Sequence, residues 1–75
     1  MDRGEVRGWV YQFIIQFIQK NGYPPTVREI CDGLYLSSTE SVHYQLTLLE
    51  REGMIKRKKD SPRAIQVIGW KFVKE

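Results

Sequence analysis

Residues 21–31 read NGYPPTVREIC, and this stretch decides the fold because it ends one helix and begins another. Asn21 and Gly22 favour the left-handed backbone conformation that ends a helix. The two prolines that follow disfavour helical geometry in the residues before them. Thr26 and Glu29 have the spacing of a capping box, in which each side chain accepts a bond from the other residue's backbone N–H. The stretch therefore predicts a rigid corner that aims a second helix.

Apolar residues on both sides of the corner predict three helices, over about residues 3–21, 26–34 and 38–52. The first has a stripe at spacings of three and four, which indicates one buried face. Its members are Val6, Val10, Phe13, Ile14, Phe17 and Ile18. The inner face of the second helix is Val27, Ile30, Cys31 and Leu34, and that of the third is Val42, Leu46 and Leu49. Ser37 or Ser38 is a candidate cap for the third helix, and Gly53 is its expected stop.

After Gly53 the pattern changes to short, partly β-branched segments around the turn formers Asp60, Ser61 and Pro62. This predicts a β-hairpin over about residues 54–68, with Ile55, Ile65 and Val67 turned inward. The predicted fold class is mainly α with a small β-hairpin. We interpret residues 1–75 as one domain, a three-helix winged helix-turn-helix, with a tail over residues 69–75.

Composition narrows the possible functions. The chain has 75 residues, and no apolar run approaches the roughly 20 residues of a membrane span. No signal peptide is evident, and a single cysteine suits a reducing compartment, so we expect a cytoplasmic, nucleoid-associated protein without membrane contact. Cys31 reads as a small buried hydrophobe, and His43 is the only histidine. With no nucleophile and base visible together, we expect no enzyme activity, no metal site and no cofactor.

The charge distribution points to an anionic partner. Net charge is only +3, but five of the cations fall within residues 56–63: Lys56, Arg57, Lys58, Lys59 and Arg63. A basic strip on a nearly neutral body fits a nucleic-acid backbone. The alternative is a solvated hairpin tip that has no partner.

The outer face of the third helix carries short or planar polar groups rather than a mixture of lysine and glutamate. We assign base reading to Ser38, Glu40, Ser41, His43 and Tyr44. Hydroxyl groups can bond several base edges, glutamate can accept from cytosine N4, and an aromatic ring can contact the thymine methyl group. The alternatives are that the serines only cap the helix, that His43 is merely solvated, and that Glu40 only favours the helix N-terminus. We assign phosphate contacts to Thr26, Arg28, Thr39 and Thr47 and to the five cations of the basic strip.

Three motifs, NGYPPTVREI, LSSTESVHYQLTLLEREGMIKR and SPRAIQV, closely resemble the N-terminal DNA-binding domain of LexA repressors, over roughly residues 13–67. The resemblance implies a winged helix-turn-helix that binds palindromic operators in double-stranded DNA and represses damage-response genes. It implies base or phosphate contacts from the five assigned residues of the third helix, and backbone contacts from the wing.

The chain departs from the family pattern in three places. It has RGEVR where the family has a Leu-Thr/Ser-x-Arg-Gln signature. Tyr35 stands where the family has glycine before the third helix, so a turn with positive φ would strain Tyr35. The family continues into a self-cleaving, dimerising domain, whereas this sequence stops at Glu75. We therefore expect no self-cleavage. The chain is either an excised domain or a free-standing regulator, and the departure from the family at residues 3–9, where no foreign tag is visible, favours the second.

Two questions stay open at this point. A winged helix can also serve as a protein-docking module, or as a replication or accessory factor that does not read sequence. The tail carries Trp70 and Phe72 at a spacing of two, which fits a strand with one aromatic face. These rings either fold onto the first helix and enlarge a thin core, or meet their copies in a homodimer.

Overall fold

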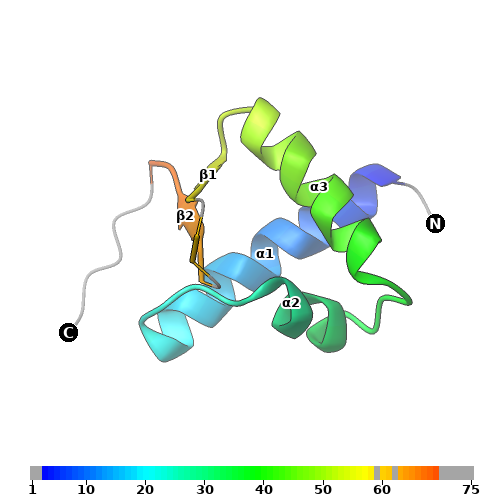
Figure 1. The fold of residues 1–75 in the computed structure, drawn as a ribbon, viewed down its shortest axis with the longest axis horizontal. Coiled ribbons are helices and arrows are strands. Elements are labelled where there is room, and N and C mark those ends of the chain that lie inside the picture. The colour runs from blue at the N-terminus through cyan, green and yellow to red at the C-terminus, as the bar shows by residue number, and fades with distance from the viewer. Residues whose placement is uncertain (1–2, 59, 62, 70–75) are drawn as a thin grey trace.

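Three helices and one β-hairpin follow one another in the computed structural model, which describes residues 3–58, 60–61 and 63–69 (Figure 1). The elements are α1 (Arg3–Asn21), α2 (Val27–Gly33), α3 (Thr39–Arg51), β1 (Ile55–Arg57) and β2 (Ile65–Val67). The strands are antiparallel, with Ile55 opposite Val67 and Arg57 opposite Ile65. This arrangement confirms the predicted winged helix-turn-helix. The wing, as we use the term, is the hairpin from β1 to β2.

The corner after α1 has the predicted geometry. Gly22 has φ of 80°, and its N–H donates to the Ile18 carbonyl at 2.7 Å, which ends α1. The Thr26 N–H donates to Glu29 Oε1 at 2.8 Å, and the Glu29 N–H donates to Thr26 Oγ1 at 3.1 Å. The capping box is therefore formed, and α2 begins one residue later than the sequence indicated because Thr26 is the cap itself.

The helices α2 and α3 end in the same backbone motif, with a tyrosine at the left-handed position after α2 and a glycine at that position after α3. After α3, Gly53 has φ of 76°, and the Met54 N–H reaches back to the Leu49 carbonyl at 3.0 Å. After α2, Tyr35 has φ of 55°, and the Leu36 N–H reaches back to the Cys31 carbonyl at 3.0 Å. Both are Schellman ends, whose left-handed residue is usually glycine. Tyr35 therefore does carry the positive φ that its place in the family pattern implied.

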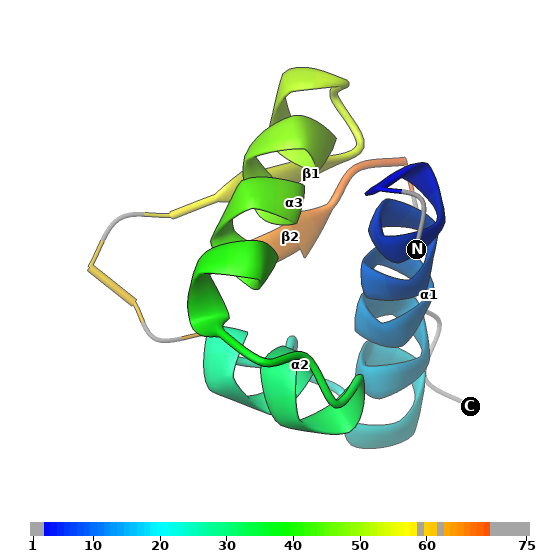
Figure 2. The same ribbon diagram turned by 90° about the vertical axis from the view of Figure 1, so that its right-hand side faces the viewer.

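The core lies between the three helices and the inner side of the wing. α1 and α3 stand side by side, α2 packs against both, and the wing packs on α3 through β1 (Figure 2). The buried hydrophobic residues are Val10, Ile14, Ile15, Ile30, Cys31, Val42, Leu46, Leu49, Ile55, Ile65 and Val67. Cys31 is buried as expected, and its thiol donates to the Leu36 carbonyl at 3.2 Å.

Several core positions differ from the sequence interpretation. Ile15 is buried although it lies outside the predicted stripe, whereas Phe13 and Phe17 are only half-buried. The Phe13 ring lies where a Cβ on Gly33 would fall, so this glycine allows α1 and α2 to approach. Gln45 is 4% exposed and takes a core position on α3 that its polar type did not suggest. Trp70 and Phe72 of the tail lie outside the described residues.

Candidate nucleic-acid interface

α3 divides its residues between the core and the outer face as predicted. Val42, Leu46 and Leu49 are buried, and these three residues anchor the helix. The residues assigned to base reading lie on the other side or at the start of the helix. Ser38, Glu40, His43 and Tyr44 are exposed, and Ser41 is half-buried. The helix therefore presents a polar face that packing does not require.

The start of α3 leaves its serine hydroxyl groups close together at the surface. Ser38 occupies the N-cap position, with φ of −151° and ψ of 151°, but its hydroxyl makes no capping bond. Instead Ser38 Oγ lies 3.5 Å from Ser41 Oγ. The structure therefore does not support the alternative that Ser38 serves only as a side-chain cap of the helix. Hydroxyl groups beside a helix N-terminus suit a phosphate or a base edge.

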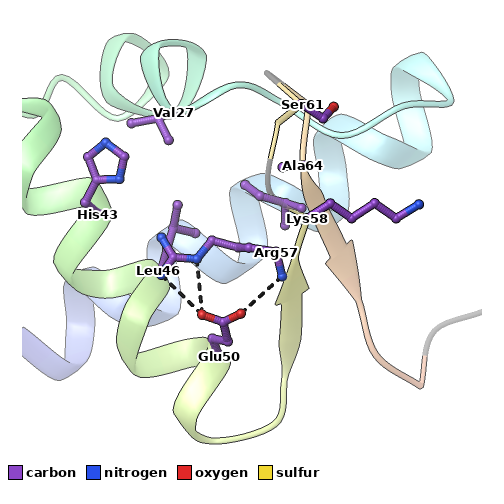
Figure 3. A pocket seen from close by; sticks show the side chains of 9 residues that line it. Val27, His43, Leu46, Glu50, Arg57, Lys58, Ser61 and Ala64 are labelled. Atoms are coloured by element: carbon purple, nitrogen blue, oxygen red, sulfur yellow. Dashed lines mark hydrogen bonds and ion pairs between the residues drawn. The ribbon is translucent and has the colours of Figure 1, made fainter.

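The wing holds Arg57 against α3. The Arg57 guanidinium donates to Glu50 Oε1 from Nε at 3.3 Å and from Nη2 at 3.2 Å. Nη2 also donates to Thr47 Oγ1 at 3.2 Å, and the backbone N–H of Arg57 donates to Glu50 Oε2 at 3.3 Å. Figure 3 shows the Arg57 side chain turned toward Glu50, whereas the Lys58 side chain extends away from it. Two residues assigned to phosphate, Thr47 and Arg57, thus contact each other.

Arg63 is held in the same way at the other side of the wing. Its Nη1 donates to Glu29 Oε1 at 2.7 Å and to the Pro24 carbonyl at 2.9 Å. Its guanidinium carbon lies 4.5 Å from the centre of the Tyr23 ring. The pKa of Glu29 is lowered below its ordinary value of 4.5, first by the hydrogen bond from Arg63 and second by the hydrogen bond from the Thr26 backbone. The hydrogen bond to Glu29 in turn raises the pKa of Arg63.

The remaining assigned residues differ in how freely they project. Lys56 and Lys58 are exposed, and the structure records no ion pair for either among the residues it describes. Arg28 pairs weakly with Asp32 at 3.7 Å, with both side chains well exposed. Thr26 uses its hydroxyl in the capping box, and Thr39 is half-buried in the first turn of α3. Lys59 lies outside the described residues.

A hollow of about 350 Å³ lies between α2, α3 and the wing (Figure 3). Its apolar lining consists of Val27, Leu46, Ala64 and Ile65. The Arg57 and Glu50 side chains span the space between the helix and the wing at one end of the hollow, and His43 lines it from α3. Among the described residues, no group of three or more His, Cys, Asp or Glu side chains could hold a metal ion. Within the same residues, no helix has the length and apolar character that crossing a bilayer requires.

The chain matches the model of the LexA DNA binding domain over residues 7–64. It belongs to this family. The LexA repressor of Clostridium botulinum (strain Hall) is 54% identical over 59 residues, which cover 79% of this chain and 29% of that protein. The LexA repressor of Clostridium novyi is 51% identical over 59 residues. That of Carboxydothermus hydrogenoformans is 44% identical over 66 residues, which cover 88% of this chain and 32% of that protein.

The LexA match includes every residue that we assigned to DNA contact, from Thr26 to Arg63. It therefore confirms the resemblance on which those assignments partly rest, while the roles of the individual residues stay predictions. The matching model describes a DNA-binding domain, which supports the expectation that this part of a LexA-type protein is not catalytic. The chain spans less than a third of the length of the botulinum and novyi relatives and about a third of the Carboxydothermus relative.

Sequence reasoning missed the acidic partners of the wing. Glu50 and Glu29 each hold an arginine that had been assigned to phosphate, from distances of seven and 34 residues along the chain. In the sequence, the capping box already explained Glu29, so no further partner was expected for it. The spacing of Glu50 and Arg57 did not indicate a contact either. In this LexA-type domain, Glu50 and Glu29 hold two arginines of the wing, so fewer wing cations project freely into solvent.

Proposed function

We propose that this domain binds double-stranded DNA in a sequence-specific manner and acts as a transcriptional repressor at the nucleoid. α3 enters the major groove, where Ser38, Glu40, Ser41, His43 and Tyr44 read bases. The wing lies along the sugar-phosphate backbone. The observation that carries the proposal is the outer face of α3, which is polar, exposed and unneeded by the core, and whose His43 lines the same hollow as Lys58 of the wing.

The chemistry of this surface supports two kinds of contact. The polar groups of α3 offer donors and acceptors that suit base edges in the major groove. Lys56 and Lys58 offer charge to phosphates, and this contact would be the same for every sequence. The N-terminus of α3, with the Ser38 and Ser41 hydroxyl groups, supplies further donors for a phosphate.

The relatives are named repressors, and a palindromic operator is the target that fits a helix-turn-helix module best. One module reads one half-site, so palindrome reading needs two copies held about one helical turn apart. We propose that the tail, with Trp70 and Phe72, contributes to this pairing. Sedimentation of the full chain and of a version ending at Ile68, each with and without a palindromic duplex, tests the pairing. If both versions behave as monomers under both conditions, the dimer proposal is wrong.

Selection of bound duplexes from a random pool tests the main proposal. We expect an enriched motif, and a symmetric one if two copies bind together. Binding to the selected duplex should weaken steeply with salt, because lysines on phosphates release counterions. No enrichment, together with binding that does not respond to salt, would favour a protein-docking role instead.

A further inference from the structure

The contact between Glu50 and Arg57 lies at the junction of the two proposed DNA-binding elements. Glu50 is on α3 and Arg57 is on β1, and their side chains are 40% and 29% exposed. One carboxylate accepts three bonds from one arginine, two from the guanidinium and one from the backbone N–H. The pair therefore fixes both the side chain of Arg57 and the strand that carries it.

Thr47 completes the attachment. Its Oγ1 accepts from Arg57 Nη2 at 3.2 Å and itself donates to the His43 carbonyl at 2.9 Å. The guanidinium is thus bonded to two side chains of α3, one turn apart. An arginine in this state has fewer N–H groups left for a phosphate, which it would otherwise bind through two parallel bonds.

A carboxylate at the position of Glu50 lowers the affinity for DNA. Glu50 repels phosphates and neutralises a cation that would attract them, so it weakens binding to every duplex. Base contacts do not depend on this cation, because sequence is read by side chains on the face of α3. The loss is therefore about the same for every duplex, whatever its sequence.

We propose that Glu50 is an affinity-limiting residue, which withholds Arg57 from phosphate and holds the wing at a fixed position beside α3. By reducing sequence-independent attraction, it weakens binding to operator and to non-operator DNA by about the same factor. The inference rests on the proposed DNA-binding function and adds to it a residue that acts against affinity.

Four variants test the proposal: E50A, R57A, the double variant E50A/R57A, and E52A. Glu52 is the matched control, because it also pairs with an arginine, Arg7 at 3.1 Å, and its side chain is 43% exposed. Each variant is titrated with the selected duplex and with a scrambled duplex of the same length, at salt concentrations from about 50 to 200 mM. Thermal melts check that each variant is folded. If E50A is not folded, E50Q, which keeps the size of the side chain, replaces it.

E50A should bind the scrambled duplex about two- to five-fold more tightly at low salt, the worth of one exposed charge pair. Its log–log salt slope should steepen by about 0.9, for one added phosphate contact. The selected duplex should gain by about the same factor, so the ratio of the two affinities stays unchanged. Adding R57A should remove the gain and restore the wild-type slope, while R57A alone and E52A leave the slope unchanged.

The inference would be overturned by an unchanged slope in E50A, by a gain that survives R57A, or by a gain on only one of the two duplexes. A slope that falls by about 0.9 in R57A alone would also overturn it, since Arg57 would then already contact phosphate. Failure of the wider proposal looks different, because wild-type protein would then show no salt-dependent preference for any duplex.

Discussion

Arg63 Nη1 in the wing lies 2.7 Å from Glu29 Oε1 in α2, although 34 residues separate the two in the chain. The same carboxylate closes the capping box at Thr26, and the same guanidinium bonds the Pro24 carbonyl and lies over Tyr23. One ion pair therefore joins the start of α2, the proline corner and the wing.

Replacing Arg63 with alanine should lower Tm by a few degrees, because the wing loses its attachment to the corner. The matched control is K56A, which removes an exposed wing cation for which the structure records no ion pair within the described residues. Thermal unfolding followed by circular dichroism measures both. Equal Tm values for R63A and K56A would show that the contact adds nothing to stability.

The same pair should make the domain sensitive to acid. Arg63, and after it Thr26, lower the pKa of Glu29 in the folded state below 4.5. A lowered pKa contributes stability that is present above the unfolded value and is lost as pH falls through the folded one. The Tm difference between wild type and E29Q should therefore be largest near neutral pH and shrink below pH 4.5. A difference that is constant with pH would contradict the ionic origin.

Tyr44→Ala should cost about 1–3 kcal/mol on the selected duplex and much less on a scrambled one. The reason is that Tyr44, on the outer face of α3 and 46% exposed, is assigned to a base rather than to phosphate. Q16A, an exposed position on α1, serves as the control. Equal losses on both duplexes would mean that α3 positions the protein without reading sequence.

Lys58→Ala should weaken binding to all duplexes alike and reduce the salt slope by about 0.9. Lys58 is exposed, and its side chain extends away from the acidic Glu50 (Figure 3). K20A, which removes an exposed lysine from the last turn of α1, controls for the change in net charge. If K58A and K20A change the slope equally, the wing lysine makes no particular phosphate contact.

Tyr35→Gly should leave stability unchanged or raise it by about 1 kcal/mol. The left-handed conformation costs a side-chain-bearing residue about 1–2 kcal/mol, which exceeds the entropic cost of glycine. The ring is 93% exposed, so its removal forfeits little packing. Tyr35→Ala separates the two effects, since alanine also loses the ring but keeps the strained Cβ. Only the glycine variant should gain stability in chemical denaturation.

Local patterns predicted the fold well because its decisive signals are short. The capping box, the glycine after α3 and the inward residues of the hairpin each depend on neighbours within a few positions. Gln45 was missed because its burial depends on how α3 packs rather than on its residue type.

The site was predicted less completely, since a cation's availability depends on tertiary contacts. In the sequence, Arg57 and Lys58 are equivalent members of one basic strip. In the structure, the first meets Glu50 and the second does not (Figure 3). Alternation along a strand sends neighbours to opposite faces, but no sequence pattern says which face meets an acid.

The division of α3 into an anchored side and an unneeded side bears on how such a domain diverges. Substitutions at Ser38, Glu40 or His43 leave the anchoring residues Val42 and Leu46 untouched and cost little folding free energy. Mutational drift or directed evolution can therefore change which operator the domain recognises by substituting one exposed position at a time, while the core stays unchanged. Selection would act more strictly near the C-terminal end of the helix, where Glu50 has a structural attachment as well as a place at the proposed DNA-binding surface.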